Sequence, residues 1–439
     1  MRTLLLFRGA PGCGKSTYIK EHDLEKYTLS ADTIRLMCQG GQETPAGTME
    51  ISPQNDDVVW DMLFKLLEVR MSHGEFTVID ATNSKTVEIN RYKNLAKQYR
   101  YRMYIIDMTD LPIDECKRRN ALRAPLKRVP DAAIDKMYAR FATQKIPSGV
   151  TVLSSDVNVL EKLNYVPQDF NNWNKIHIIG DVHGCYSCLK EYLGDLKDDE
   201  LYIFVGDYLD RGIENVEMFK FLCDVVDNNR KNVILLEGNH ERWLNKWGHD
   251  EPVQSEEFAN YTRPQLFKAG IDHNTARKVY SRVGQCSYFD YDEKRYFVSH
   301  GGLSYLPEFL PFVSTDQMVK GVGRYPDMLT VAESWEKSMP DSYIQIFGHR
   351  NVQDVPIDMG HRCYNLEGKI EFGGYLRCVE LEHGQSIKCV ETKNDVFRKE
   401  EPKTETAVEM KTEFDNAELV SKMRQSKYVF EKRFGDISS

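Results

Sequence analysis

The stretch Gly9-Ala-Pro-Gly-Cys-Gly-Lys-Ser16 has the GxxxxGKS spacing of a phosphate-binding loop. It follows the apolar run 3–7, which predicts a buried parallel strand, and it leads into a helix. Glycines let backbone N–H groups close around phosphate oxygens, and the positive end of the helix dipole adds to the attraction. In this context, the motif predicts an α/β domain that binds a nucleotide.

The loop also assigns roles to individual side chains. We expect Lys15 to reach the β- and γ-phosphates of ATP and the Ser16 hydroxyl to bind Mg²⁺. Cys13 is expected to serve only as a small residue in the loop. The predicted nucleotide-binding residues are Gly9, Gly12, Cys13, Gly14, Lys15, Ser16 and Thr17.

Strands and helices succeed one another through the first part of the chain. Apolar spacing predicts strands at 76–80 and 102–107 and helices at 57–71 and 131–144. The expected inner face of the first helix comprises Val58, Met62, Leu63, Leu66 and Leu67. Residues 1–165 are therefore predicted to form a domain of the P-loop NTPase type with a parallel sheet.

A second α/β series follows a polar stretch. Residues 166–174 are predicted to be a linker and 175–390 a second domain. Its expected strands lie at 176–180, 201–205, 232–236, 295–299 and 343–347, and each leads directly into residues such as Asp, His or Asn. Residues 391–439 are predicted to be a polar tail, in which 415–434 is either a terminal helix with Leu419, Met423 and Phe430 as docking residues or a disordered segment.

Asp32 and Arg35 are three residues apart and would share one side of a helical turn. Such a pair suits a base that accepts a hydroxyl proton beside a cation that holds the acceptor's phosphate. A helix start with a capping acid is the alternative interpretation.

A basic segment runs from Lys117 to Arg128. Arg119 and Arg123 are four residues apart on an expected helix, so they would share a face and close over the donor phosphates. A solvated basic surface is the alternative.

Together with Asp80-Ala-Thr-Asn83 and Arg128-Val-Pro130, these motifs resemble the 5′-OH polynucleotide kinase family across the whole first domain. The resemblance implies that Asp32 is the general base and that Arg35 holds the acceptor's phosphate. It further implies that Asp80 organises the acceptor site and that Arg119 and Arg123 serve the donor phosphates.

The second domain contains five motifs in order: GDVHG at 180–184, GDYLDRG at 206–212, GNHE at 238–241, SHGG at 299–302 and GH at 348–349. One metal ion can bind Asp181, His183 and Asp207, and a second can share Asp207. The remaining ligands of the second ion would be Asn239, His300 and His349. These donors suit Mn²⁺, Fe²⁺, Ni²⁺ or Zn²⁺, and two such ions can activate a hydroxide for attack on phosphorus.

Three neighbouring residues complete this predicted centre. His240 suits a general acid for the leaving oxygen, oriented by Asp210, and Arg211 suits a clamp for phosphate oxygens. Cys185 and Cys188 form a CxxC pair without a second ligand pair, so two buried thiols are favoured over a zinc or redox site.

These motifs resemble the calcineurin-type metallophosphoesterase superfamily over residues 175–390, and its phosphoprotein-phosphatase-like branch in particular. The implied fold is an α/β metallophosphoesterase sandwich. The order of the two domains resembles bacterial kinase-phosphatase-ligase RNA repair enzymes. That resemblance implies ATP-dependent phosphorylation of 5′-OH ends and removal of 3′-phosphate or 2′,3′-cyclic phosphate ends of RNA or DNA. No Lys-x-Asp-Gly adenylation motif is present, so a separate ligase is the expected downstream partner.

Composition limits these interpretations. The net charge of −9 argues against general electrostatic binding of duplexes but allows an enzyme that grips strand termini. No apolar stretch of membrane-spanning length is present and the ten cysteines suggest reduced thiols, so a cytoplasmic enzyme without membrane contact is expected. The sequence leaves open whether the protein forms a homo-oligomer. The rivals are a non-catalytic scaffold and a small-molecule kinase fused to a protein Ser/Thr or dinucleoside-polyphosphate phosphatase.

Overall fold

The apolar run before the phosphate loop forms β1 (Thr3–Arg8) in the computed structural model, which describes residues 2–45 and 47–398. β1 is the central strand of a five-stranded sheet in which each neighbouring pair is parallel. The sheet order is β2 (Thr28–Ser30), β5 (Thr77–Asp80), β1, β6 (Arg102–Asp107) and β7 (Thr151–Ser154). Leu4 and Leu6 pack on one face of the sheet and Leu5 and Phe7 on the other, as a strand buried on both faces requires.

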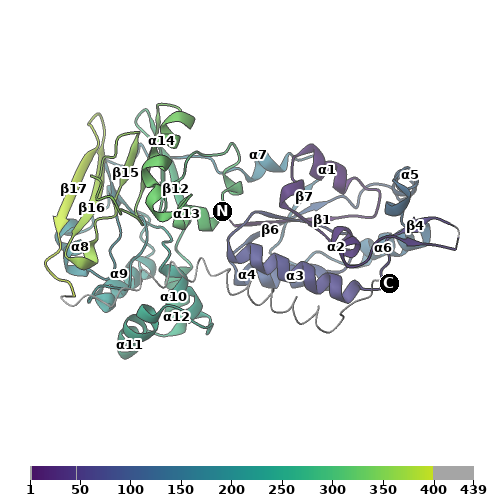
Figure 1. Cartoon of the computed structure of the whole chain (residues 1–439), viewed down its shortest axis with the longest axis horizontal. Helices are drawn as coiled ribbons and strands as arrows, with labels where there is room; N and C mark the ends of the chain where they lie inside the picture. The colour runs from purple at the N-terminus through teal and green to yellow at the C-terminus, as the bar shows by residue number, and fades with distance from the viewer. Residues whose placement is uncertain (1, 46, 399–439) are drawn as a thin grey trace, which may run out of the picture.

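Helices connect these strands and cover the sheet (Figure 1). They are α1 (Lys15–Glu21), α2 (Ala31–Cys38), α3 (Asp56–Ser72), α4 (Thr86–Gln98), α5 (Ile113–Ala121), α6 (Asp131–Thr143) and α7 (Val159–Leu163). A small hairpin of β3 (Gln42–Glu43) and β4 (Met49–Glu50) follows α2. The predicted strands and helices of this domain are confirmed, with ends that shift by one residue at most.

The inner face of α3 differs from its prediction. Leu63 and Leu67 are buried as expected, but Val58, Met62 and Leu66 are 46–50% exposed. The other buried residues of the helix are Val59, Phe64 and Met71. α3 is apolar around more than one side, so its sequence alone does not specify which side packs against the sheet.

The second lobe consists of two five-stranded sheets (Figure 1). The first has the order β11 (Val233–Leu235), β10 (Glu200–Phe204), β9 (Lys175–Ile179), β16 (Tyr375–Glu382) and β17 (Lys388–Lys393). The second has the order β15 (Cys363–Asn365), β14 (Tyr343–Phe347), β13 (Lys294–Ser299), β12 (Cys286–Tyr291) and β8 (Gln168–Asp169). Ile178 and Ile203 of the first sheet share a buried core with Val298 and Ile346 of the second, so the sheets form a sandwich.

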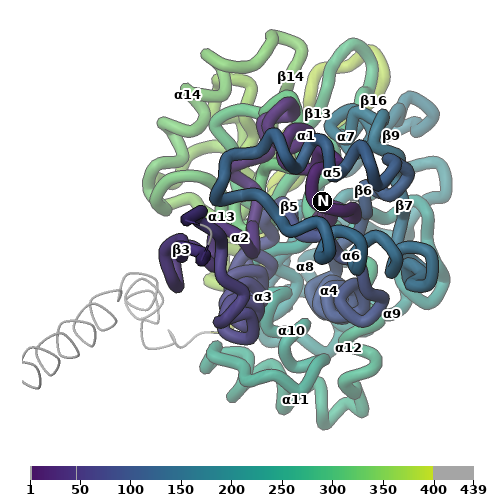
Figure 2. The backbone as a smooth tube through the Cα atoms, turned by 90° about the vertical axis from the view of Figure 1, so that its right-hand side faces the viewer, coloured from purple at the N-terminus to yellow at the C-terminus, as the bar shows by residue number. Residues whose placement is uncertain are grey.

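Helices cover the outer faces of this sandwich. α8 (Tyr186–Leu193) and α9 (Asn215–Asp227) pack on the first sheet, and α14 (Met328–Ser338) packs on the second. α10 (Glu241–Gly248), the π-helix η3 (Phe258–Thr262), α11 (Arg263–Lys268) and α12 (His273–Tyr280) follow β11. α10, α11 and α12 gather at one edge of the lobe in both views (Figures 1 and 2). The predicted fold class, an α/β domain with a parallel sheet followed by an α/β sandwich, is confirmed.

Two predicted boundaries are corrected by strand pairing. β8 lies inside the segment predicted as a linker, where it pairs with β12. β17 crosses residue 390 and pairs with β16 along its whole length, so the sheet extends into the segment predicted as a tail. The predicted helix at 415–434 lies outside the described residues. Within the described part of the chain, no helix has both the length and the apolar character needed to cross a membrane.

Candidate functional site

The phosphate loop joins β1 to α1, and close packing requires a glycine at position 12. A Cβ atom on Gly12 would lie 2.2 Å from the Cys116 carbonyl oxygen, and Gly12 has a φ of +87°. The Lys15 ammonium donates to the carbonyl oxygens of Gly9 at 2.9 Å and Ala10 at 3.0 Å. Lys15 therefore lies over its own loop, at the centre of the predicted nucleotide-binding residues, and a bound phosphate would have to replace these carbonyl contacts.

Asp80 lies at the end of β5 and faces the start of α1. Its Oδ2 accepts a hydrogen bond of 3.3 Å from the Ser16 hydroxyl. Burial raises the pKa of Asp80, although the Lys15 charge opposes that shift. An acid beside the phosphate-loop serine is the arrangement that holds Mg²⁺ in P-loop enzymes. The contact favours a role for Asp80 beside Mg²⁺, in addition to its predicted role at the acceptor site.

The Asp32 and Arg35 side chains lie together on α2, and a third residue joins them. Arg35 Nη1 is 2.7 Å from Asp32 Oδ1, and Arg35 Nε is 2.7 Å from Asp56 Oδ1 on α3. Ser30 accepts a hydrogen bond from the Thr33 N–H, so Ser30 is the capping residue of α2 and Asp32 is free of that task. Asp56 was not identified from the sequence, because nothing in the chain pattern brings it to Arg35.

The prediction that Arg119 and Arg123 share a helical face is wrong. α5 ends at Ala121, and Arg123 lies in the following turn. Pro125 explains the end of the helix, because proline cannot donate the next backbone hydrogen bond and disfavours a helical conformation in the residue before it. Arg119 pairs with Glu115 at 2.6 Å, whereas the charge of Arg123 acts on Asp80 and opposes part of the rise that burial causes in the pKa of Asp80.

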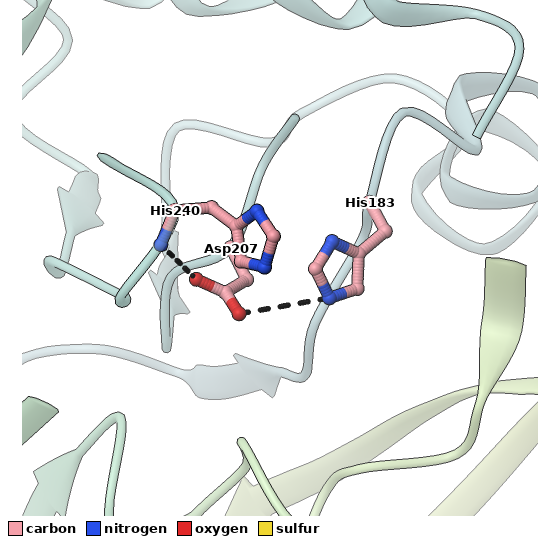
Figure 3. Close-up of side chains that lie close together, drawn as sticks. All are labelled: His183, Asp207 and His240. Atoms are coloured by element: carbon pink, nitrogen blue, oxygen red, sulfur yellow. Dashed lines mark hydrogen bonds and ion pairs between the residues drawn. The ribbon is translucent and has the colours of Figure 1, made fainter. Parts of the chain in front are cut away.

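In the second lobe, the predicted metal ligands follow strand ends of both sheets and converge. Asp181 follows β9, Asp207 follows β10 and Asn239 follows β11, whereas His300 and His349 follow β13 and β14. His300 Nε2 lies 3.2 Å from Asp207 Oδ2 and 3.2 Å from Asn239 Oδ1. His183 Nε2 lies 3.6 Å from Asp207 Oδ2, and Figure 3 shows both side chains beside His240. The structure thus brings the predicted ligands into one cluster around Asp207.

The backbone at this cluster is strained. His183, Asp207 and His349 have φ values of +44°, +51° and +70°, in the left-handed region that residues with side chains rarely adopt. Strained residues of this kind cluster at functional sites, where the surrounding structure holds them in place. All three residues lie in the loops after strands, and their side chains meet in the cluster.

The cluster also fits divalent metal ions because two of its buried donor atoms lack hydrogen-bond partners. Asp181 Oδ1 and His300 Nδ1 are buried, and neither has a hydrogen-bond partner among the described residues. The two atoms are 3.8 Å apart, too far for a hydrogen bond. Buried polar atoms without partners are rare in native proteins, and two metal ions bound at this cluster would satisfy these atoms. Asp207, His300 and His349 form one group with ligand spacing, and Asp181, His183 and Glu367 form another.

Glu367 and Glu241 were missed from the sequence. Burial and the nearby Glu367 carboxyl raise the pKa of Asp181 well above its ordinary value. Glu367 comes two residues after β15, so the strand-end rule would have found it had this short strand been recognised. The Glu241 carboxylate accepts hydrogen bonds from the backbone N–H groups of Asp207, Tyr208 and Gly238, and it therefore ties the second motif to the third.

His240 has the expected neighbour. Its Nδ1 lies 2.7 Å from Asp210 Oδ2, and its buried Nε2 has no hydrogen-bond partner among the described residues. Burial alone would lower the pKa of His240, but the carboxylates of Asp207 and Asp210 raise it. The Thr262 hydroxyl, from the helical segment after β11, donates to Asp210. A protonated His240 with an open Nε2 is the arrangement that a general acid needs.

Arg211 lies at the same site but is paired. Its Nη1 is 3.0 Å from Glu371 Oε1 and 3.4 Å from His183 Nε2. A phosphate would have to compete with Glu371 for this guanidinium. Cys185 and Cys188 are both buried free thiols.

Comparison with known proteins agrees with this geometry. The AAA domain family model matches residues 4–144, and the calcineurin-like phosphoesterase model matches residues 174–379. The bis(5′-nucleosyl)-tetraphosphatase PrpE of Geobacillus thermodenitrificans is 30% identical over 224 residues, which cover 46% of this chain and 88% of that protein. Serine/threonine-protein phosphatase 2 of Salmonella typhimurium is 36% identical over 85 residues, which cover 19% of this chain and 36% of that protein.

The comparison with solved structures finds, among others, a protein serine/threonine phosphatase from Saccharomyces cerevisiae. It is 14% identical, with a TM-score of 0.37, over 56% of this chain and 87% of that one. Three findings agree: the geometry of the predicted metal ligands, the phosphoesterase family model, and the similarity to a relative whose length the chain covers almost completely. The chain belongs to the calcineurin-like phosphoesterase family and joins this phosphoesterase to an N-terminal P-loop kinase-like domain.

Proposed function

We propose that this protein is a bifunctional enzyme that heals the ends of broken RNA or DNA. It would phosphorylate 5′-OH ends with ATP and hydrolyse 3′-phosphate or 2′,3′-cyclic phosphate ends, after which a separate ligase would join them. The observation that carries this proposal is the Asp32–Arg35 pair, in the same domain as a phosphate loop whose Ser16 contacts Asp80. That set can bind a phosphate-bearing alcohol as acceptor, in a chain that also contains a phosphoesterase centre.

In the kinase reaction, Asp32 would accept the proton of the 5′-hydroxyl as its oxygen attacks the γ-phosphorus of ATP, and ADP would leave. The Asp32 side chain is 56% exposed, so a strand end can reach it. Arg35 would bind the nearest phosphate of the acceptor in exchange for Asp56. Lys15 would leave its loop carbonyls and bind the donor phosphates.

In the phosphatase reaction, His240 would donate its Nε2 proton to the leaving 3′ oxygen, with Asp210 holding the opposite nitrogen. Arg211 would bind phosphate oxygens in exchange for Glu371. The ligands of the metal ions would be Asp181, His183, Asp207, Asn239, His300 and His349. When bound, two divalent ions such as Mn²⁺ or Ni²⁺ would activate water for in-line attack on phosphorus.

Hydrolysis of dinucleoside tetraphosphates is a second candidate function. It is favoured by the 30% identity to a bis(5′-nucleosyl)-tetraphosphatase over residues of the second domain. This alternative assigns the same centre to a phosphoanhydride bond, and it leaves the P-loop domain with a small-molecule acceptor. The two candidates differ in whether a 5′-OH strand end accepts phosphate.

One RNA substrate tests both halves of the proposal. A short RNA with a 5′-OH and a 2′,3′-cyclic phosphate would be incubated with labelled ATP, Mg²⁺ and Mn²⁺ or Ni²⁺, with diadenosine tetraphosphate and a phosphopeptide in parallel. We expect label at the 5′ end and loss of the 3′ phosphate. Lys15→Ala should abolish only the first reaction and Asp181→Ala only the second. Hydrolysis of the tetraphosphate with neither RNA end changed would overturn the end-healing proposal.

A further inference from the structure

We propose that the P-loop domain is a structural part of the phosphoesterase metal centre, because it holds the two loops that present Asn239 and His300. Two separate sets of contacts cross between the lobes, and each reaches one of these loops. This inference rests on metal-dependent hydrolysis in the second lobe but not on the identity of its substrate.

The first set of contacts is a buried ion pair. Arg2 lies directly before β1 and is 9% exposed, and its Nη2 donates to Glu237 Oε1 at 3.0 Å and Oε2 at 2.9 Å. The Tyr280 hydroxyl at the end of α12 donates to the same Oε1 at 2.5 Å. Burial opposes the charge of Arg2, but Glu237 more than compensates and raises the arginine pKa. The buried arginine therefore keeps its charge and depends on Glu237 as its partner.

Glu237 lies two residues before Asn239, at the point where β11 becomes the GNHE loop. Its backbone N–H donates to the Gly284 carbonyl at 2.7 Å, and the next N–H, of Gly238, donates to Glu241. The GNHE loop is therefore held from within its own lobe by Glu241 and from the P-loop domain by Arg2. Arg100 adds to the attachment that Arg2 makes. Its Nη2 donates to the Val283 carbonyl at 2.6 Å, in the segment that follows α12.

The second set of contacts starts at the turn after α3. The N–H groups of Thr315 and Asp316, at the start of α13 (Thr315–Lys320), donate to the carbonyl oxygens of Gly74 and His73. His73 Nδ1 also lies 2.8 Å from Asp316 Oδ2. Two residues farther along α13, the Met318 carbonyl accepts a 2.7 Å hydrogen bond from the N–H of Gly301, directly after His300.

The two paths end on residues that touch each other, since Asn239 Oδ1 and His300 Nε2 are 3.2 Å apart. Both residues belong to the group that would surround one metal ion together with Asp207 and His349. Groups behind metal ligands orient them, and their loss typically lowers metal affinity or activity by about 10- to 100-fold. Arg2 and Gly74 are accordingly positioning residues that act through Glu237 and α13.

Gly74 offers a specific way to disturb the second path. Its φ is +70°, and a Cβ atom added there would lie 2.1 Å from Thr315 Oγ1 across the interface. Gly149 is a matched control in the same domain, because its φ is +74° and only the Lys93 side chain comes near, at 3.9 Å. Both substitutions to alanine strain the backbone equally, but only the first one pushes the domains apart.

The test measures Mn²⁺ binding to the full-length chain by calorimetry and by the electron paramagnetic resonance of the bound ion, with hydrolysis of p-nitrophenyl phosphate as the second readout. We expect Arg2→Ala and Gly74→Ala to weaken binding of one Mn²⁺ about tenfold or more. Arg2→Lys should restore part of the affinity, whereas Gly149→Ala and Arg91→Ala, which removes an exposed arginine elsewhere on the same domain, should bind like wild type.

Tyr280→Phe keeps the ring and removes only the hydrogen bond to Glu237. It tests the contact path through Glu237 if Arg2→Ala does not fold. We expect Tyr280→Phe to weaken Mn²⁺ binding as well, but by less than Arg2→Ala. Wild-type Mn²⁺ affinity in Gly74→Ala and in either Arg2→Ala or Tyr280→Phe would overturn the inference, even if thermal stability falls. A wild-type protein that binds no Mn²⁺ and hydrolyses no ester would instead contradict the metallophosphatase assignment.

Discussion

The two phosphate sites of this chain are held in opposite ways. In the kinase-like domain, the Asp32 and Arg119 side chains are about half exposed and are paired with other side chains of the same domain. In the phosphoesterase lobe, the side chains of Asp181, Asp207 and His300 are at most 3% exposed and lie on strained backbone or in tight loops. The second site is preformed, whereas the first would have to exchange ion pairs to bind the proposed substrate.

Removal of Asp207 is expected to have the largest effect. Its carboxylate lies between His183 and His300, so Asp207→Ala should lower phosphoesterase activity by about a thousandfold or more while the kinase reaction continues. Metal binding and both activities would be measured on one preparation, with Asp199→Ala as an exposed control. Equal loss of both activities would show that the sites are not independent and would contradict the comparison.

His240→Gln is expected to have the next largest effect. Loss of a general acid lowers rates by about 10²- to 10⁴-fold. The size of the loss should depend on the leaving group, because p-nitrophenol leaves without a proton and a nucleoside hydroxyl does not. Rates with p-nitrophenyl phosphate and with a 3′-phosphorylated oligonucleotide would be compared. Equal losses on both substrates would show that His240 acts in some way other than proton donation.

The sequence predicted the arrangement of the phosphoesterase centre better than that of the kinase site, because the two sites are held by different elements of the fold. Strand ends fix the positions of Asp181, Asp207 and Asn239, so a pattern of apolar runs followed by polar residues was enough to assemble them. Glu367 was missed because the strand before it, β15, has the sequence Cys-Tyr-Asn and lacks the apolar run that marks the equally short β11. The partners of the kinase site come from separate helices, and local spacing says nothing about how those helices pack.

Several features of the fold depended on long-range packing and could not be predicted. β16 and β17 complete one sheet by antiparallel pairing with β9 and with each other, far from any motif. The buried side of α3 was chosen by the sheet beneath it, because Val58 and Leu66 are as apolar as Val59 and Leu67. The pair Arg2–Glu237 spans 235 residues of sequence, and no local signal connects its two members.

A moderate effect is expected from Thr262→Val, which preserves shape and removes the hydroxyl that donates to Asp210. A hydrogen bond to a charged group typically contributes about 1.5–3 kcal/mol, so kcat should fall about tenfold. KM should change little, because the Thr262 hydroxyl contacts Asp210, which orients the general acid and is not a predicted metal ligand. Thr275→Val, which removes an exposed hydroxyl that donates to Asp272, is the control. An unchanged kcat would mean that the segment after β11 does not support the acid pair.

The smallest effect is expected at Asp56, and it tests the exchange of ion pairs in the kinase site. Asp56→Asn should weaken the hold on Arg35 and leave this guanidinium more available to the acceptor's phosphate. Half-exposed ion pairs contribute up to about 1 kcal/mol, so KM for a 5′-OH oligonucleotide should fall by up to about fivefold at unchanged kcat. Asp61→Asn, on the same helix and paired with exposed Arg91, is the matched control. A rise in KM would mean that Asp56 instead holds Arg35 in its binding position, so that the kinase site is preformed like its neighbour.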